Sequence, residues 1–134
     1  MELKQNFSEA YNNRGSAYIN QNNYNQAIAD YTQALEYQPD NAEAYTNRGV
    51  AYYYQGNYTQ ALADYDNAIK LNSDLAEAYY NKAGIYSLQR EIKAAIENLQ
   101  RAIQLDATLR ENAKTDSDFD NIRQDQQFQA LVGQ

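Results

Sequence analysis

The stretch EAYTNRGVAYYYQGNY, residues 43–58, decides the fold, because its first part has already occurred once in the chain. The sequence YNNRG begins at Tyr11, and YTNRG begins at Tyr45, thirty-four residues later. Self-similarity at a fixed period of this length is typical of proteins built from stacked copies of one small structural unit. The three consecutive tyrosines at 52–54 are therefore interpreted as parts of such a unit.

The repeat extends well beyond this motif. Residues 8–41 and 42–75 agree at eighteen of thirty-four positions without a gap, and residues 76–109 agree with the second copy at twelve. We therefore divide the chain into three units, 8–41, 42–75 and 76–109, followed by a segment, 110–134, in which the register is lost.

Each unit carries two helical patterns, with small and aromatic residues at the i, i+3, i+4, i+7 spacing of an amphipathic helix. In the first unit these residues are Ala10, Tyr11, Gly15 and Tyr18, followed by Ala27, Ile28, Tyr31, Ala34 and Leu35. A helix pair of this size cannot bury its apolar stripe alone, so neighbouring pairs must stack. The pattern predicts an all-α fold, an α-solenoid of stacked antiparallel helix pairs.

The combined motif resembles that of the tetratricopeptide repeat family, which places an aromatic residue, a hydrophobic residue, Gly and Tyr in the first helix, then Ala, an aromatic residue, Ala and Pro. The first unit fills these places with Tyr11, Arg14, Gly15, Tyr18, Ala27, Tyr31, Ala34 and Pro39. The third unit departs from the pattern, with Ala83 at the glycine and Leu99 at the second aromatic position. The resemblance implies a right-handed superhelix in which the first helix of each pair lines a concave surface.

The arginine of the triplet departs from the usual hydrophobic residue. Arg14 and Arg48 are followed sixteen residues later by Asp30 and Asp64, and in the third unit Lys82 and Asn98 replace such a pair. This joint change predicts an ion pair between the two helices of the first and of the second unit.

A short helix around residues 107–114 is expected to begin a fourth unit that is not completed. The remainder of the segment 110–134 is expected to close the array, because a solenoid needs a polar-backed cap over its last apolar face. Phe119, Ile122, Phe128 and Leu131 are predicted to form the inner side of this cap. The alternative is a mobile docking arm. With the capping helix, residues 1–134 are predicted to form a single domain.

The composition disfavours several kinds of partner. The formal net charge of −7 makes attraction to nucleic acid or to an anionic membrane surface unexpected. The first residues, MELKQNFSEAY, show no basic region followed by an apolar core, so we expect no signal peptide and a cytoplasmic protein.

The residues needed for common catalytic chemistry are missing as well. The chain contains no histidine and no cysteine, which removes the commonest general base, the thiolate nucleophile and most zinc sites. The string of Asp116, Asp118 and Asp120 lacks the glycine and glutamate that a calcium loop requires, so we interpret these carboxylates as helix caps. We predict no enzyme activity, no cofactor and no metal.

On the arrangement that the resemblance implies, one asparagine per unit falls on the concave surface: Asn13, Asn47 and Asn81. A row of amide side chains can pair with the backbone of an extended peptide, although these asparagines can also pair within the array. Tyr53, Tyr54 and Tyr80 are predicted to turn toward the same surface, where tyrosines make good interface anchors.

Glutamates recur at the rim of this surface, as Glu9, Glu43 and Glu77, and favour a neutral or basic ligand. The clamp by which some tetratricopeptide cochaperones hold the acidic tail of heat-shock chaperones consists of Lys and Asn, then Asn, then Lys and Arg. We exclude that clamp because the corresponding residues here are Asn12, Ser16, Asn47, Glu77 and Asn81.

These observations predict a non-catalytic protein–protein interaction module, a scaffold that binds a peptide or helical segment of a partner in its concave groove. The alternative is a structural role in which the array assembles with copies of itself as a homo-oligomer. The incomplete fourth unit and the polar tail argue against growth from end to end.

Overall fold

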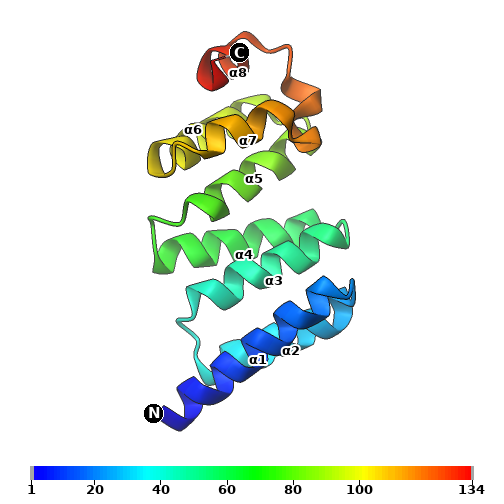
Figure 1. Ribbon diagram of the computed structural model, residues 1–134, viewed down its shortest axis with the longest axis vertical. Coiled ribbons are helices and arrows are strands. Elements are labelled where there is room, and N and C mark those ends of the chain that lie inside the picture. The colour runs from blue at the N-terminus through cyan, green and yellow to red at the C-terminus, as the bar shows by residue number, and fades with distance from the viewer. Residues whose placement is uncertain (1, 134) are drawn as a thin grey trace. The chain divides into compact units, whose positions relative to one another are not determined.

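The computed structural model describes residues 2–133, which form helices and contain no strand. The helices are α1 (Glu2–Asn20), α2 (Tyr24–Tyr37), α3 (Ala42–Tyr54), α4 (Tyr58–Leu71), α5 (Ala76–Leu88), α6 (Ile92–Leu105), α7 (Leu109–Thr115), the 3-10 helix η1 (Ser117–Ile122) and α8 (Gln126–Val132). Successive helices pack in pairs, as the 34-residue period predicts (Figure 1). The all-α solenoid of helix pairs is confirmed.

The helices fall into two compact units, which we call the N-terminal unit (α1 to α4) and the C-terminal unit (α5 to α8). In the N-terminal unit α1 packs on α2 and α3 on α4, while α2 also packs on α3. Buried alanines line these contacts, among them Ala27, Ala34, Ala44 and Ala51. The small side chains let the helix axes approach closely, so within this unit the apolar stripe of the first pair is covered by the second pair.

A tyrosine ring lies directly on a helix glycine in each of the first two repeats. A Cβ atom added to Gly49 would lie 2.7 Å from Cε1 of Tyr65, and one added to Gly15 would lie 2.8 Å from Cε1 of Tyr31. Neither separation leaves room for a carbon atom. In the third repeat the ring is replaced by the smaller Leu99, and Ala83 occupies the glycine position. The glycine therefore accompanies the tyrosine because the ring needs the space of the missing Cβ.

The predicted ion pairs are confirmed in both repeats. Nε and Nη2 of Arg14 donate to the two carboxylate oxygens of Asp30 at 2.7 and 2.8 Å, and Arg48 binds Asp64 in the same way at 2.8 Å. The Asp64 side chain is 4% exposed and that of Arg48 19%, whereas the Arg14 side chain is 59% exposed. The hydrogen bond to Asp64 raises the pKa of Arg48 above its ordinary value. The second pair is therefore the more shielded from water.

Tyrosine rings flank each of these arginines. The guanidinium of Arg48 lies 5.7 Å from the ring centre of Tyr45 and 6.0 Å from that of Tyr52, one turn before and one turn after it on α3. Arg14 has the same relation to Tyr11 and Tyr18. Cation–π attraction and the buried carboxylate together explain why a charged residue occupies a position that is usually hydrophobic.

The turn between the two helices of a pair has one geometry in all three repeats. Asn22, Gly56 and Arg90 adopt φ values of 63°, 76° and 62°, and the next residue donates its N–H to the carbonyl oxygen of Tyr18, Tyr52 or Tyr86 at 2.8 to 2.9 Å. This is a common way of ending a helix, and glycine adopts it most easily. Arg90 adopts the left-handed conformation although its side chain disfavours it, because the helices on either side of the turn are arranged as in the other two repeats.

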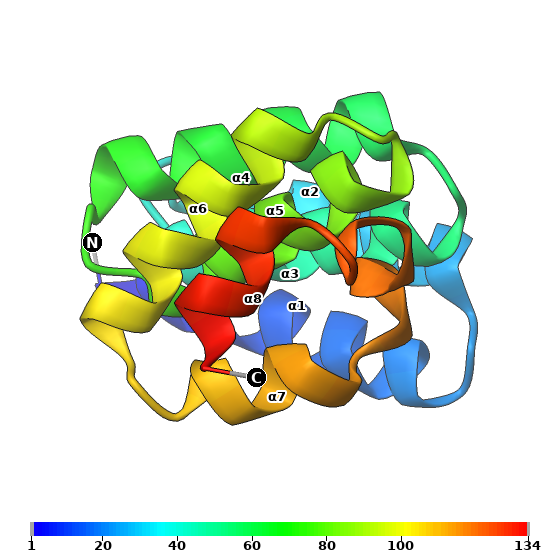
Figure 2. The ribbon, with the colours of Figure 1, turned by 90° about the horizontal axis from the view of Figure 1, so that it is seen from above.

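The C-terminal unit is closed by the tail. α7 begins a fourth repeat, η1 then returns to pack on α5, and α8 contacts α6 and α7 (Figure 2). Phe119, Ile122 and Phe128 are buried in one cluster with Leu99, and Leu131 packs against it partly buried. The predicted cap is confirmed, and the alternative of a mobile docking arm is wrong, because these side chains form the core of the unit.

We predict that Gly49→Ala lowers the free energy of unfolding by about 1–3 kcal/mol, because overpacking against the Tyr65 ring outweighs the better helix propensity of alanine. Adding Tyr65→Leu, which reproduces the pairing of Ala83 with Leu99, should recover part of this loss. Urea denaturation of the two single variants and the double variant measures the coupling. Strictly additive losses would contradict the account of the glycine.

We also predict that Arg48→Ala is more damaging than Arg14→Ala. The first substitution leaves Asp64 without its partner in a site that water hardly reaches, at a cost of about 3 kcal/mol. The second exposes Asp30 to solvent on the side where Arg14 already lies in water, so its effect should be clearly smaller. Chemical denaturation of the two variants provides the comparison. Equal losses in the free energy of unfolding would show that solvent exposure does not determine how much each ion pair stabilises the fold.

Candidate peptide-binding face

The first helices of the two N-terminal repeats, α1 and α3, contact each other within the N-terminal unit. Glu9 and Asn13 lie one turn apart on α1, and Glu43 and Asn47 lie one turn apart on α3. Glu9, Asn13 and Glu43 are exposed, and Asn47 is half-buried. We call these four residues, together with Asn12, the α1–α3 face.

Asn12 connects the two helices of this face. Its amide nitrogen donates to Oε1 of Glu43, and its carbonyl oxygen accepts a hydrogen bond of 3.2 Å from Nδ2 of Asn47. The side chain of Asn12 is buried. Asn47 thus pairs within the array, as one of the two sequence interpretations holds. Sequence reasoning did not identify Asn12 as the residue that joins α1 to α3, although its separation from Asn47 by one period plus one residue was a usable signal.

Tyr53 and Tyr54 lie at the other end of α3, away from Glu43. The ring of Tyr54 stacks on that of Tyr24 at 5.2 Å, and the ring of Tyr53 lies 5.2 Å from Tyr54 and 6.1 Å from Tyr58. The structure therefore gathers these two predicted residues with two further tyrosines, one from the start of α2 and one from the start of α4. Tyr24 and Tyr58 were not among the predicted site residues, although they occupy equivalent positions of the first two repeats.

The predicted residues of the third repeat, Glu77, Tyr80 and Asn81, belong to the C-terminal unit. Glu77 is exposed and Asn81 is half-buried. Tyr80 differs from the expectation of an open interface anchor, because the tail lies on it. Its hydroxyl donates to Oδ2 of Asp116 at 2.8 Å, and its ring meets that of Phe119 at 5.5 Å. Burial, and then the hydrogen bond to Asp116, raise the pKa of Tyr80 well above its usual value.

The segment that covers Tyr80 makes further contacts along α5. Nδ2 of Asn121 donates to the carbonyl oxygen of Ser87 at 3.2 Å, and the carboxylate of Asp118 lies 3.2 Å from the place where a Cβ on Gly84 would be. η1 therefore occupies the side of α5 on which Tyr80, Gly84 and Ser87 lie, four and three residues apart.

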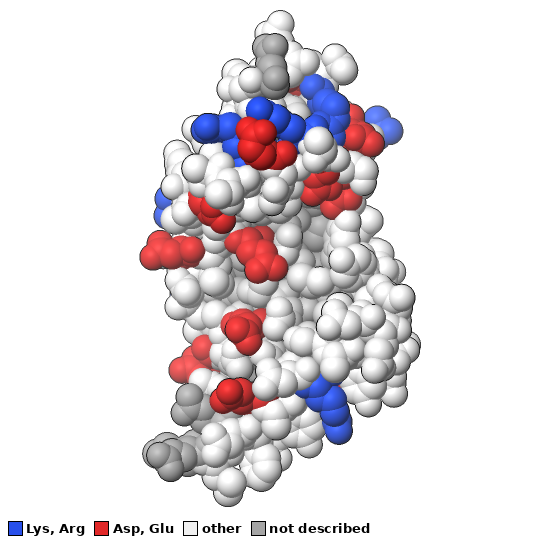
Figure 3. Space-filling model, viewed as in Figure 1, with Lys and Arg blue, Asp and Glu red and all other residues white. Residues whose placement is uncertain are grey.

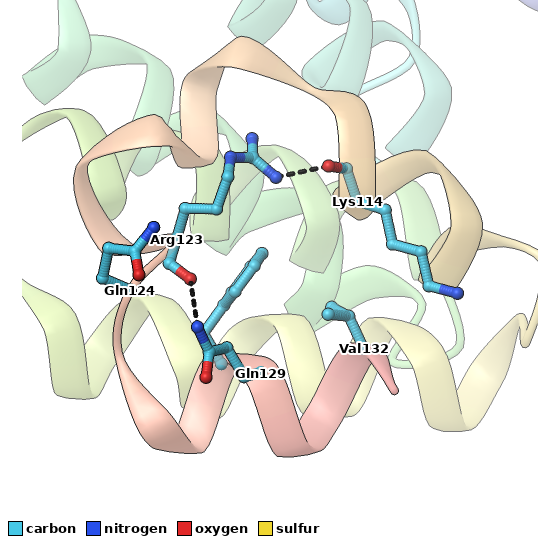
Figure 4. A pocket seen from close by; sticks show the side chains of 6 residues that line it. Lys114, Arg123, Gln124, Gln129 and Val132 are labelled. Carbon is cyan, nitrogen blue, oxygen red and sulfur yellow. Dashed lines mark hydrogen bonds between the residues drawn. The ribbon is translucent and has the colours of Figure 1, made fainter. Parts of the chain in front are cut away.

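The tail itself is held together by Arg123, which lines a hollow of about 360 Å³ with Lys114, Gln124, Phe128, Gln129 and Val132 (Figure 4). Its guanidinium donates to the carbonyl oxygens of Lys114 and Asp116 and to the carboxylate of Asp120. These hydrogen bonds connect α7 to η1 and engage most of the guanidinium donors, so we assign Arg123 a structural role.

The aspartates of the tail act as caps. Asp116 accepts from the backbone N–H of Asp118, and Asp125 accepts from those of Gln127 and Phe128. Within residues 2–133 no three acidic side chains converge in a way that could hold a metal ion. The same part of the chain has no helix long and apolar enough to cross a membrane.

Charge is distributed unevenly over these elements. On the face seen in Figure 3, acidic side chains lie over the left side of the N-terminal unit, and basic ones gather over the tail together with acidic ones. The arginine of α3, Arg48, is turned to Asp64, and that of α1, Arg14, to Asp30. The α1–α3 face itself consists of carboxylate and amide side chains.

A 34-residue period, antiparallel helix pairs and a turn of constant geometry define a helical repeat protein. Models of the tetratricopeptide repeat match residues 42–75 and 76–109, and a model described as TPR repeat matches residues 15–56. The chain belongs to the tetratricopeptide repeat family. No curated protein matches it in sequence.

Solved structures of similar fold include the first TPR domain of Spaghetti (RPAP3) bound to the HSP90 peptide SRMEEVD, with 23% identity, a TM-score of 0.77, and coverage of 96% of this chain and 95% of that one. The Arabidopsis OM64 TPR domain has 24% identity and a TM-score of 0.77 over 78% and 87% of the two chains. MamA has 21% identity and a TM-score of 0.80 over 94% and 72%. At these identities the likeness shows the fold alone.

We predict that the protein loses stability as the pH rises above about 10, the usual pKa of tyrosine, because there the unfolded chain ionises Tyr80 and the folded chain does not. Below that pH both states keep the hydroxyl neutral and stability is unaffected by it. Urea denaturation between pH 8 and pH 11 should show a smaller decline for Tyr80→Phe than for the parent chain.

Some decline should remain in that variant, since burial also raises the pKa of Tyr31. Identical pH dependence in the two chains would contradict the buried, hydrogen-bonded state of Tyr80.

Proposed function

We propose that this chain is a non-catalytic protein-binding module that holds a neutral or basic peptide segment of a partner on its α1–α3 face. The observation that carries the proposal is the chemistry of this face, where Glu9 and Glu43 are exposed beside the amides of Asn13 and Asn47. Carboxylates accept hydrogen bonds from lysine, arginine and backbone N–H groups, and amides both donate and accept. Membership of the tetratricopeptide repeat family and the fold of the similar structures support a role in protein binding.

The fixed positions of the side chains on the α1–α3 face also favour peptide binding. Asn12 is buried and holds Glu43 and Asn47 in place, so these side chains are positioned before a ligand arrives. Groups fixed in advance lose little conformational entropy on binding. An exposed carboxylate supported in this way can select a basic group on the ligand through charge.

The ligand should differ in charge from the acidic peptide bound in the structure of the first TPR domain of Spaghetti. Asn12 is engaged with Glu43 and Asn47, and the hydroxyl of Ser16 pairs with that of Tyr31 at 2.9 Å. An acidic peptide on this face would meet Glu9 and Glu43 instead of lysines. Like charges placed together suppress binding, so an acidic tail is the partner that this face disfavours.

A pair of labelled nonapeptides tests the proposal, one alternating lysine with alanine and one alternating glutamate with alanine. We predict that the lysine peptide binds and the glutamate peptide does not, as measured by fluorescence anisotropy at low ionic strength. Combining Glu9→Gln with Glu43→Gln should weaken binding of the lysine peptide about tenfold, which corresponds to about 1.4 kcal/mol. Glutamine keeps an oxygen that can accept from Asn12, so the fold of the face is preserved.

Glu36→Gln is the matched control for each of the single variants Glu9→Gln and Glu43→Gln, because Glu36 is exposed on α2 and its substitution likewise removes one negative charge. Affinity for the lysine peptide should stay near that of the parent chain in this variant. Equal weakening by Glu36→Gln, or equal binding of both peptides, would count against the α1–α3 face as the binding site.

A further inference from the structure

Two long charge-free stretches meet at the turn end of the N-terminal unit. Residues 15–29 and 49–63 contain no Asp, Glu, Lys or Arg, and they occupy equivalent positions in the first and second repeats. The equivalent stretch of the third repeat, 83–97, contains Arg90, Glu91, Lys93 and Glu97. The turns lie on the right of the N-terminal unit in Figure 1, and that side is white in Figure 3 apart from one basic side chain below them. The absence of charge is therefore a property of this surface and not of the repeat in general.

Four tyrosine rings form a continuous cluster on this surface, and with Asn22, Asn25 and Gln55 we call it the tyrosine edge. The rings of Tyr24, Tyr54, Tyr53 and Tyr58 follow one another at centre distances of 5.2, 5.2 and 6.1 Å. Tyr54 is 55% exposed, so about half of its surface is available to a ligand. Tyrosine buries a large area on binding at low conformational cost, and tyrosines among asparagines and glycines are typical of binding surfaces.

An open hollow of about 490 Å³ adjoins the ring of Tyr24 and is lined by amide side chains: Asn22, Asn23, Asn25, Gln26 and Gln55. Oδ1 of Asn22 accepts a hydrogen bond of 2.9 Å from the Tyr24 hydroxyl, and Oδ1 of Asn25 accepts one from the amide of Gln55. Because their oxygens are engaged, Asn22 and Asn25 present N–H donors to a ligand. The hollow thus combines amide groups, the N–H donors of Asn22 and Asn25 among them, with the ring of Tyr24, and no charged side chain lines it.

These properties fit a ligand that has carbonyl acceptors, apolar rings and few donors. A proline-rich segment has this composition, since proline lacks the backbone N–H and its ring is apolar. Such segments adopt the extended polyproline II helix, which leaves every carbonyl oxygen without an internal hydrogen bond and is ordered before it binds. Aromatic-lined surfaces recognise them by packing against the proline rings while donors bind the carbonyls.

We propose that the tyrosine edge binds an uncharged, proline-rich segment of a partner protein in the polyproline II conformation. The inference rests on the proposed function in so far as both concern a peptide ligand, but it assigns a second surface with a different selectivity. The α1–α3 face selects by charge, whereas the tyrosine edge selects by ring packing and by N–H donors. Binding at the tyrosine edge is accordingly insensitive to salt.

Isothermal titration calorimetry of the full chain with decaproline, acetylated and amidated at its ends, tests this assignment. Affinity should change less than about twofold between 20 and 300 mM NaCl, because no ions are released when uncharged groups bind. Tyr54→Ala should weaken binding at least tenfold. Gln55→Ala, a second exposed position that frees Asn25 from its hydrogen bond, should weaken it about threefold.

The third repeat supplies the control. Gln89 is exposed and equivalent to Gln55, but it follows Leu88 instead of a tyrosine and precedes Arg90, so Gln89→Ala should leave binding of decaproline unchanged. Circular dichroism checks that the helices of each variant are intact. The lysine peptide and the variants of Glu9 and Glu43 judge the proposed function separately, so that either proposal can fail alone.

Three results would overturn the assignment. The first is no binding of decaproline, or binding that neither Tyr54→Ala nor Gln55→Ala weakens. The second is binding of the uncharged oligosaccharide cellohexaose in its place, which would assign the amides of the hollow to sugar hydroxyls. The third is a concentration-dependent dimer in sedimentation that Tyr54→Ala abolishes, which would show that a second copy of the chain covers the edge.

Discussion

The contact between a tyrosine ring and a helix glycine determines how the two helices of a repeat lie against each other. Tyr31 rests on Gly15 and Tyr65 on Gly49, at separations that a Cβ atom would not allow. Once the ring is seated, the guanidinium one residue before the glycine is brought within reach of the buried aspartate on the second helix. The ion pair between the two helices of each of these repeats follows from this approach, since in close-packed interiors small changes of volume shift neighbouring groups.

Much of the fold could be predicted from the sequence, because the repeat presents each contact twice. The pairing of Arg14 with Asp30 was visible in the joint change of both residues at Lys82 and Asn98. The cap could be predicted from the apolar residues Phe119, Ile122 and Phe128. The left-handed conformation of Arg90 was less accessible, because tertiary context there overrides the preference of the side chain.

The candidate site was predictable only in part. Asn47 and Glu43 could be placed on one stripe of α3 from their spacing, but the bridge through Asn12 depends on how far α1 is shifted along α3. The separation of Asn12 and Asn47 by one period plus one residue was compatible with such a contact, but the repeat pattern alone does not determine that shift. Tyr80 was interpreted as an open residue from its place on the first helix of its repeat, whereas its environment is set by η1, which lies outside the repeat. The environment of a residue is hardest to predict from periodicity when it is formed by a segment outside the repeat.

The return of η1 to α5 also bears on how an array of this kind can change in length. Tandem duplication of a 34-residue module after residue 109 would separate the tail from the helices whose side chains it matches, including Tyr80 and the Ser87 carbonyl. A module inserted before residue 76 would keep that match intact. Descendants of this sequence should therefore gain or lose modules on the amino-terminal side of the third repeat, with the last repeat and the tail inherited together as one block.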